Sequence, residues 1–232
     1  MRAAVVGGSL GGLYAAVLLR DLGIDVDIYE RSPVELAQRG AGIGFLPESQ
    51  RYLVERAGVA LDEISVPTAH IRYLHRNADV LFETPHAYRF SSWNTVYRRL
   101  LTRFPAEHYH LSYEMTGWQL RDNEVEIAFA AQMARRADLA VMADGVGSLA
   151  RARLLPEVRS AYSGYVAWRG MAPEAQLDAA TRARCSITPL PISSMPTATF
   201  WFIRFPGWMV RSNTVIGYSI SSGIATILQE AT

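Results

Sequence analysis

The first thirty residues alternate between apolar runs, glycines and acidic residues in a pattern typical of a strand, a helix and a second strand. Residues 3–6 are all apolar and precede a pair of glycines, which predicts a short buried strand. Residues 10–22 are mostly apolar and precede Gly23, as expected for a helix that ends there. Apolar residues then alternate with aspartates over residues 24–28, just before Glu30. The pattern therefore predicts a βαβ unit.

Further along the chain, hydrophobic spacing predicts two helices that are separated by strand-like sequence. Residues 47–57 form the first predicted helix, which ends at Gly58, and Asn94 begins the second. Between them, residues 69–90 are rich in aromatic and β-forming residues around a polar centre at residues 76–79, which predicts an inserted hairpin. Strands are also expected over residues 109–113, 115–120, 125–129 and 139–142.

The last part of the chain has few charges. Of the 48 residues from 185 to 232, only Arg204, Arg211 and Glu230 are charged, whereas Trp, Phe, Ile and Ser are abundant. This stretch either forms sheet that something else covers, or it is a stretch whose continuation is missing.

Composition and charge narrow the class of protein. Half of the 232 residues are hydrophobic and 19% are charged, which excludes a disordered chain, and a net charge of +1 gives no global attraction to nucleic acid or anionic lipid. Cys185 is the only cysteine, so a disulfide within the chain and a cysteine-based zinc site are excluded, and we expect the reducing cytoplasm. Residues 3–19 are uncharged, but glycines interrupt them, so we favour neither a signal peptide nor a membrane anchor.

The strongest chemical motif lies in the predicted βαβ unit. Gly7, Ser9 and Gly12 occupy the three positions of the G-x-G-x-x-G fingerprint, and Glu30 lies 18 residues after Gly12 at a strand end. In such a turn, a pyrophosphate meets backbone N–H groups at the positive end of the helix dipole, and the carboxylate accepts hydrogen bonds from a ribose. Serine replaces the second glycine, and its hydroxyl could bind a phosphate oxygen. The motif predicts dinucleotide binding without choosing between FAD and NAD; the alternative is a tight turn beside a solvated Glu30.

Five segments together resemble one enzyme family. They read VVGGSLGGLYAAVLLRDLGIDVDIYERS, RGAGIGFLP, SSWNTVYRRLL, ADLAVMADGVGSLAR and YSGYVAWRG. In this order they are similar, over about residues 1–170, to the FAD-dependent aromatic hydroxylases of the para-hydroxybenzoate hydroxylase type. The Gly-Gly-Ser variant is particularly similar to the dihydroxypyridine hydroxylases within that family.

The resemblance implies cofactor roles for particular residues. Arg39 matches an arginine near the flavin, and Arg98 matches another on the cofactor side, although Arg99 could make that contact instead. Asp144 and Gly145 match an Asp-Gly motif that serves both FAD and the incoming NADH or NADPH, and Ser148 and Arg151 complete it. The residues expected to hold the ADP half of FAD are Gly7, Gly8, Ser9, Leu10, Gly11, Gly12, Glu30 and Arg31.

The resemblance also implies an α/β fold in which a Rossmann-like FAD-binding domain is interleaved with a mixed-sheet substrate domain. We assign residues 1–68 and 93–158 to the FAD-binding domain, residues 69–92 to a hairpin insertion of the substrate domain, and residues 159–232 to an incomplete substrate domain. Two features depart from the family. Met142 replaces a usual glycine, where it could crowd the nucleotide, and nothing in residues 185–232 matches the family's later Gly-Asp flavin motif. We therefore expect a chain whose C-terminal part is missing.

The function implied by the resemblance is hydroxylation of a phenolic or N-heteroaromatic small molecule by molecular oxygen, through a C4a-hydroperoxyflavin and at the expense of NADH or NADPH. No metal, nucleic acid or membrane is expected, and the full-length protein could form a homodimer. The sequence assigns no catalytic residue, and candidates for the substrate pocket, by location only, are His70, Tyr73, His75, Tyr162, Tyr165, Trp168 and Arg169. Two alternatives stay open: a non-catalytic or incompletely folded FAD-binding fragment, and an NAD-dependent dehydrogenase.

Overall fold

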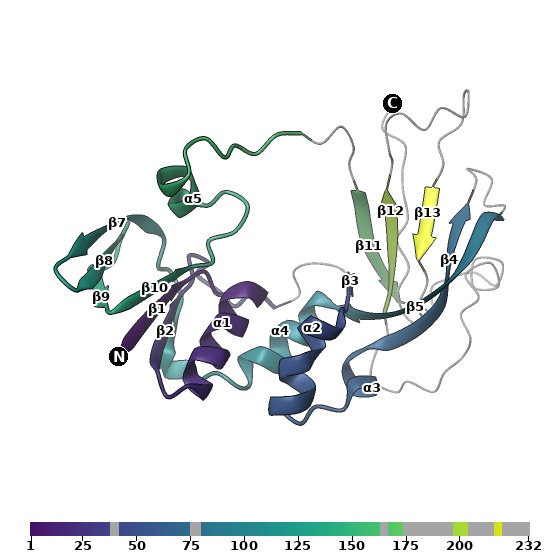
Figure 1. Cartoon of the computed structure of the whole chain (residues 1–232), viewed down its shortest axis with the longest axis horizontal. Helices are drawn as coiled ribbons and strands as arrows, with labels where there is room; N and C mark the ends of the chain where they lie inside the picture. Colours follow the sequence, from purple (N-terminus) through teal and green to yellow (C-terminus); the bar gives the residue numbers. More distant parts are fainter. Residues whose placement is uncertain (38–41, 75–79, 163–166, 174–196, 204–215, 220–232) are drawn as a thin grey trace. The chain divides into compact units, whose positions relative to one another are not determined.

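The chain forms two compact units, each built from two separate stretches of sequence (Figure 1). The computed structural model describes residues 1–37, 42–74, 80–162, 167–173, 197–203 and 216–219. Met1–Arg39 and Val96–Ala161 make the first unit, and Gly40–Thr95 and Tyr162–Thr232 make the second. The chain thus passes twice through each unit, which confirms the predicted interleaved α/β class.

The first unit contains a parallel sheet, two α-helices and a small antiparallel sheet. Helix α4 (Trp93–Leu101) crosses from the second unit into the first. The other elements are β1 (Arg2–Val6), α1 (Leu10–Asp21), β2 (Asp25–Tyr29), the 3-10 helix η2 (Ala106–His108), β6 (Tyr109–His110), β7 (Met115–Arg121), β8 (Glu124–Phe129), β9 (Arg135–Ala137), β10 (Leu139–Met142) and α5 (Leu149–Leu154).

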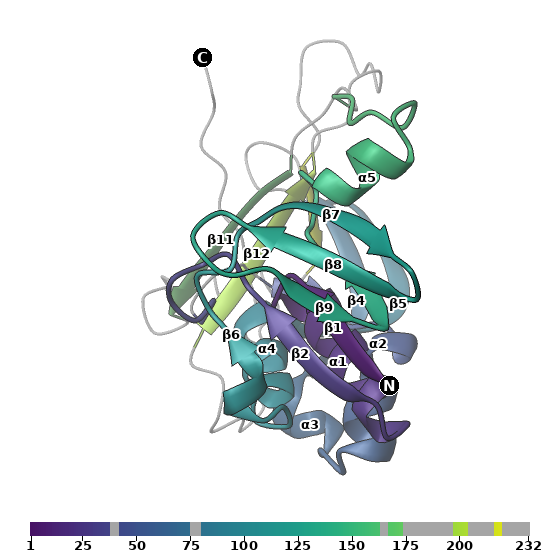
Figure 2. The ribbon, with the colours of Figure 1, turned by 90° about the vertical axis from the view of Figure 1, so that its left-hand side faces the viewer.

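The parallel sheet has the strand order β10-β1-β2-β6 and is covered on both faces. Helix α1 packs on one face and the sheet β7-β8-β9 lies on the other; Figure 2 views the parallel sheet with β7, β8 and β9 in front and α1 behind. Side chains of β1 alternate between the faces, so that Ala4 and Val6 join a buried cluster with Ile127 and Phe129. Burial on both faces explains why β1 is apolar at every position after Arg2.

The turn between β1 and α1 brings backbone segments too close together for side chains. Gly7 has a φ of +105°, and a Cβ built on it would lie 2.2 Å from the carbonyl oxygen of Ala143. A Cβ on Gly12 would lie 1.8 Å from the carbonyl oxygen of Gly7. Both contacts are with backbone, which cannot rotate aside, so these positions require glycine. Gly11 differs, because a Cβ there would meet nothing within 4 Å.

Among the described strands, the second unit is built from antiparallel pairs. The long pair β4–β5 is the hairpin predicted over residues 69–90, and it extends into a sheet of order β13-β4-β5-β3. Strands β11 and β12 form a second pair. The elements of this unit are β3 (Gly42–Gly44), α2 (Pro47–Arg51), the π-helix η1 (Tyr52–Arg56), α3 (Leu61–Ile64), β4 (Val66–Leu74), β5 (Val80–Ser92), β11 (Ala167–Pro173), β12 (Thr197–Ile203) and β13 (Ile216–Ser219).

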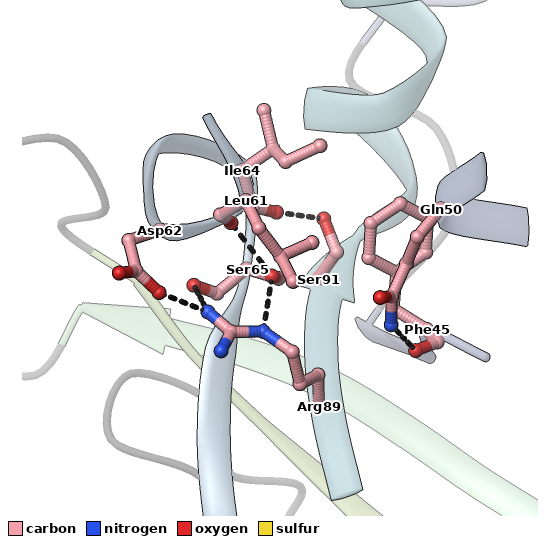
Figure 3. Close-up of polar contacts among 8 residues, drawn as sticks. All are labelled: Phe45, Gln50, Leu61, Asp62, Ile64, Ser65, Arg89 and Ser91. Carbon is pink, nitrogen blue, oxygen red and sulfur yellow. Dashed lines mark hydrogen bonds and ion pairs between the residues drawn. The ribbon is translucent and has the colours of Figure 1, made fainter. Parts of the chain in front are cut away.

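A polar network fastens helix α3 to strand β5 (Figure 3). The Arg89 guanidinium forms an ion pair with Asp62 and donates to the Ser65 hydroxyl at 2.8 Å and to the Ser65 carbonyl at 3.1 Å. The Ser91 side chain is 0% exposed and donates to the Ile64 carbonyl at 2.5 Å. These bonds satisfy carbonyl groups at the end of α3 that have no partner within a four-residue helix.

Some elements differ from those predicted. The single helix expected over residues 47–57 is an α-helix, α2, that continues as the π-helix η1. The strand expected over residues 109–113 ends at His110, because Ser112 has a φ of +62° and so leaves the extended conformation. The short elements β3, α3, η2, β9 and α5 were not predicted. Residues 40–68 group with the second unit, whereas the sequence assigned them to the first domain; the functional domain boundaries stay a prediction.

The described residues show neither a helix that could span a membrane nor a cluster of metal ligands. None of their helices combines the length and apolar character needed to span a bilayer. No group of three or more of their His, Cys, Asp or Glu side chains is placed to hold a metal ion.

Replacing Gly12 tests the close packing of α1 on β1. Gly12→Ala should lower the free energy of unfolding by about 3 kcal/mol, because the new methyl group overlaps a backbone carbonyl. Gly11→Ala is the matched control and should raise the free energy of unfolding by up to about 1 kcal/mol, since alanine favours a helix over glycine. Urea unfolding followed by circular dichroism measures both, and equal stabilities of the two variants would contradict the packing described.

Replacing Ser91 tests the network between α3 and β5. Ser91→Ala should cost about 2 kcal/mol of unfolding free energy, because the buried Ile64 carbonyl loses its donor. Thr102→Ala removes an exposed hydroxyl that donates to the Arg99 carbonyl at 3.0 Å, and it should cost no more than about 0.5 kcal/mol. The same urea titration compares the two, and a Ser91→Ala variant as stable as Thr102→Ala would contradict the role of the network.

Candidate nucleotide-binding site

Most of the predicted cofactor residues of the first unit lie at or next to the carboxyl ends of three adjacent parallel strands. The glycine turn follows β1, Glu30 follows β2, and Asp144 lies two residues after the end of β10. Ligands of open parallel α/β sheets bind at this edge. The Ala143 N–H donates to the Val6 carbonyl at 2.8 Å, which holds the loop after β10 against the glycine turn.

Glu30 is buried and bonded to the glycine turn. The residue is 6% exposed, and its carboxylate accepts hydrogen bonds from the Gly8 N–H at 2.7 Å and from the Ser32 N–H at 2.9 Å. The alternative of a solvated strand end is therefore wrong. Each carboxylate oxygen accepts one of these bonds, which leaves a lone pair on each oxygen for a further donor such as a ribose hydroxyl.

Ser9 stands at the N-cap of α1 with an extended backbone. Its carbonyl accepts the Leu13 N–H at 2.9 Å, which is the first hydrogen bond of the helix, but its hydroxyl does not cap the helix. Serine at this position commonly uses its hydroxyl for that purpose. The first-turn N–H groups and the positive end of the helix dipole favour an anion here, and the Ser9 hydroxyl lies at the same place.

Two residues at this turn were not found by sequence reasoning. The Tyr109 hydroxyl donates to the Gly8 carbonyl at 2.8 Å, and the Tyr97 hydroxyl lies 3.3 Å from that of Tyr109. The one signal that pointed to them is Gly8 itself, a glycine that the fingerprint does not require. A Cβ on Gly8 would lie 2.1 Å from the Tyr109 hydroxyl oxygen, so Tyr109 leaves too little space for a side chain at position 8.

The loop after β10 is held by its own hydrogen bonds. Asp144 accepts the Ala150 N–H at 3.3 Å, and Ser148 caps α5 by accepting the Arg151 N–H at 2.9 Å. The Arg151 guanidinium donates to the Val146 carbonyl. The predicted Asp144 to Arg151 motif therefore forms one folded loop beside the glycine turn.

Met142 packs in the core of the first unit. It pairs in register with Val6, so its side chain lies on the same sheet face, in contact with the buried cluster that includes Ile127 and Phe129. Val5 points to the opposite face, where a Cβ on Gly12 of α1 would be 3.3 Å from it. The methionine thus fills space between the two sheets, on the face away from α1.

The other predicted residues are less constrained. Arg31 and Arg98 are exposed, and Arg98 directly follows Tyr97 on α4. Arg39, His75 and Tyr165 lie outside the described residues, as does Cys185. His70 and Tyr73 lie in β4, Trp168 and Arg169 lie in β11, and Tyr162 is 75% exposed. Their roles stay predictions.

Comparison with known proteins agrees with this geometry. Residues 5–34 match the family model of the NAD(P)-binding Rossmann-like domain. The chain is 42% identical over 171 residues to 2,6-dihydroxypyridine 3-monooxygenase of Paenarthrobacter nicotinovorans. The matched region covers 73% of this chain and 43% of that enzyme. It is 31% identical over 166 residues to the FAD-dependent monooxygenase nodM of Hypoxylon pulicicidum, covering 66% of this chain and 35% of that protein.

A solved structure gives the same relationship. The structure of 2,6-dihydroxypyridine-3-hydroxylase from Arthrobacter nicotinovorans matches with a TM-score of 0.72 and 32% identity, over 95% of this chain and 56% of that one. The chain spans roughly half or less of the length of these relatives. In sequence and in fold, the chain is homologous to the FAD-dependent aromatic hydroxylases.

Proposed function

We propose that this chain supplies the nucleotide-binding part of an FAD-dependent monooxygenase that consumes NADH or NADPH and hydroxylates a phenolic or N-heteroaromatic small molecule. The observation that carries the proposal is the buried Glu30 carboxylate bonded to the glycine turn at the carboxyl edge of a parallel sheet. The 42% identity to an enzyme named for 2,6-dihydroxypyridine supports a hydroxylated nitrogen ring as the substrate.

In this proposal the ADP half of FAD lies across the ends of β1 and β2. Its pyrophosphate meets the Ser9 hydroxyl and the N–H groups that begin α1, and its ribose hydroxyls donate to Glu30. Two features support the fit of this nucleotide to the turn. Each Glu30 oxygen keeps a lone pair that can accept a further hydrogen bond, and the Ser9 hydroxyl does not cap α1. The turn residues Gly7, Gly8, Leu10, Gly11 and Gly12 provide close backbone approach, and Arg31 stands next to the ribose position.

The remaining cofactor assignments concern the flavin and the nicotinamide. Bound FAD would accept a hydride from NADH or NADPH and activate oxygen, which is the cofactor's own chemistry. The protein's part is to hold the rings and exclude water, for which we assign Arg39, Arg98, Asp144 and Gly145. The loop from Asp144 to Arg151 suits this role because its own hydrogen bonds hold it beside the glycine turn. Location in the cytoplasm and a homodimer of the full-length protein are further predictions of the proposal.

A dehydrogenase that uses a nicotinamide nucleotide alone is a second candidate. The family model that matches residues 5–34 is named for NAD(P) binding, which favours it. The two candidates differ in the nucleotide that the chain holds in the absence of substrate.

Titration of the purified chain with FAD and with NAD⁺ distinguishes them. FAD fluorescence should be quenched on binding, and the loaded protein should be yellow and should oxidise NADH or NADPH faster when 2,6-dihydroxypyridine is added under air. Tight NAD⁺ binding without FAD binding would support the dehydrogenase, and FAD binding without substrate-dependent oxidation would support a non-catalytic FAD-binding chain.

Replacing Glu30 tests the proposed ribose contact. Glu30→Gln should weaken FAD binding about tenfold, because an amide NH₂ group replaces one of the two carboxylate oxygens that accept hydrogen bonds. Glu114→Gln is the matched control: it removes the same charge at an exposed position, and this variant should bind FAD as the wild type does.

The Ser9 hydroxyl is tested with ADP as the probe. Ser9→Ala should raise the dissociation constant of ADP about fivefold, because one hydrogen bond to a charged phosphate is lost. Adenosine, which lacks phosphate, should compete equally well for both proteins. Isothermal titration calorimetry measures the affinity for ADP directly and the affinity for adenosine by competition with ADP. An unchanged ADP affinity in Ser9→Ala would contradict the phosphate contact.

A further inference from the structure

The peptide groups on either side of Gly8 are each hydrogen-bonded to a side chain. The Gly8 N–H donates to the buried Glu30 carboxylate at 2.7 Å, and the Gly8 carbonyl accepts the Tyr109 hydroxyl at 2.8 Å. Glu30 follows β2, and Tyr109 lies in β6, which pairs with β2. Two neighbouring strands of the sheet therefore fix one residue of the turn.

The space around Gly8 is filled by the same two side chains. A Cβ on Gly8 would lie 2.1 Å from the Tyr109 hydroxyl oxygen, 2.6 Å from its Cζ and 3.0 Å from the Glu30 Cβ. Gly8 and Gly11 both occupy positions that the G-x-G-x-x-G fingerprint leaves open, but only Gly11 has open space beside it. The lack of space for a side chain at position 8 thus comes from Tyr109 and Glu30, not from contact with backbone as at Gly7 and Gly12.

Tyr109 is the last hydroxyl of a relay that starts at a buried backbone group. The Leu36 N–H donates to the Tyr97 hydroxyl at 3.3 Å, and the Tyr97 and Tyr109 hydroxyls are 3.3 Å apart. Leu36 can only donate and the Gly8 carbonyl can only accept, so both hydroxyl protons point toward Gly8. Tyr97 is 0% exposed, so its hydroxyl is shielded from water, whereas Tyr109 is partly buried.

The Tyr109 hydroxyl keeps its proton. Burial of the side chain, and then its hydrogen bond with Tyr97, raise the pKa of Tyr109 well above its usual range. The hydroxyl is therefore a donor at every pH at which the protein would be assayed.

The relay determines the direction of the next N–H group. The Gly8 carbonyl and the Ser9 N–H belong to one planar trans peptide, so they point in opposite directions. Fixing the carbonyl against Tyr109 directs the Ser9 N–H, at the N-cap of α1, away from Tyr109. We propose that Tyr109 and Tyr97 are positioning residues that orient the Gly8–Ser9 peptide toward the pyrophosphate of the bound dinucleotide. This inference rests on the proposed function, since it assumes that a dinucleotide binds at the turn.

Removal of single hydroxyl groups tests the relay, with ADP as the probe. Tyr109→Phe should raise the dissociation constant of ADP about tenfold, and Tyr97→Phe should raise it about threefold because it acts through Tyr109. Tyr113→Phe is the matched control: its hydroxyl accepts from Arg135 in the same unit and does not touch the turn, so ADP binding should not change. Calorimetry measures the affinities of the wild type and the three variants for ADP, and for adenosine as a competitor. Urea unfolding reports the stability of the same four proteins.

The outcomes separate positioning from a general structural role. The proposal expects ADP affinity to fall while adenosine affinity stays constant, since adenosine has no phosphate to meet the peptide. An unchanged ADP affinity in Tyr109→Phe would overturn it, as would equal losses for ADP and adenosine. If Tyr109→Phe does not fold, Tyr97→Phe decides, because it leaves Tyr109 in contact with Gly8. A wild-type chain that binds neither ADP nor FAD would instead refute the proposed function itself.

Discussion

The hydrogen bond from the Gly8 N–H to the buried Glu30 carboxylate is the interaction on which the rest of the nucleotide site depends. It joins the turn after β1 to the end of β2 across 22 residues of sequence. An unpaired carboxylate would be costly to bury, so Glu30 is stable at 6% exposure only because two backbone N–H groups bind it. The same bonds hold the carboxylate where a ribose would bind, so folding and binding use one side chain.

Close packing around the turn follows from this arrangement. The backbone of Gly12 lies against that of Gly7, and Gly7 lies against Ala143 in the loop after β10. On the other sheet face, Met142 and Val6 pack against the sheet β7-β8-β9. The sheet is thus fixed from both sides, and the ends of β1, β2 and β10 are held together where a cofactor would lie.

The local parts of this architecture could be predicted from the sequence, whereas the long-range parts could not. Apolar alternation and the spacing from Gly12 to Glu30 predict the βαβ unit, because both signals lie within thirty residues. Tyr109 reaches Gly8 across 101 residues, and although the extra glycine indicates a crowded position, no local pattern identifies Tyr109 as its neighbour. Likewise, the positive φ of Ser112 ends a strand that its β-forming neighbours favour, and the burial of Ser91 depends on helix α3, 27 residues earlier. Tertiary contacts decide these features, so local propensity gives no warning of them.

Binding of a dinucleotide pyrophosphate by the turn from Gly7 to Gly12 can be observed at the backbone amides themselves. The most direct test follows the backbone amides of the isotope-labelled chain by nitrogen–proton correlation NMR during titration with ADP. We expect large shifts for the amides of Ser9, Gly11 and Gly12, while the Gly8 amide stays protected from hydrogen exchange throughout because Glu30 already binds it. Shifts confined to β7, β8 and β9, with none in the turn, would show that the pyrophosphate does not bind at the turn.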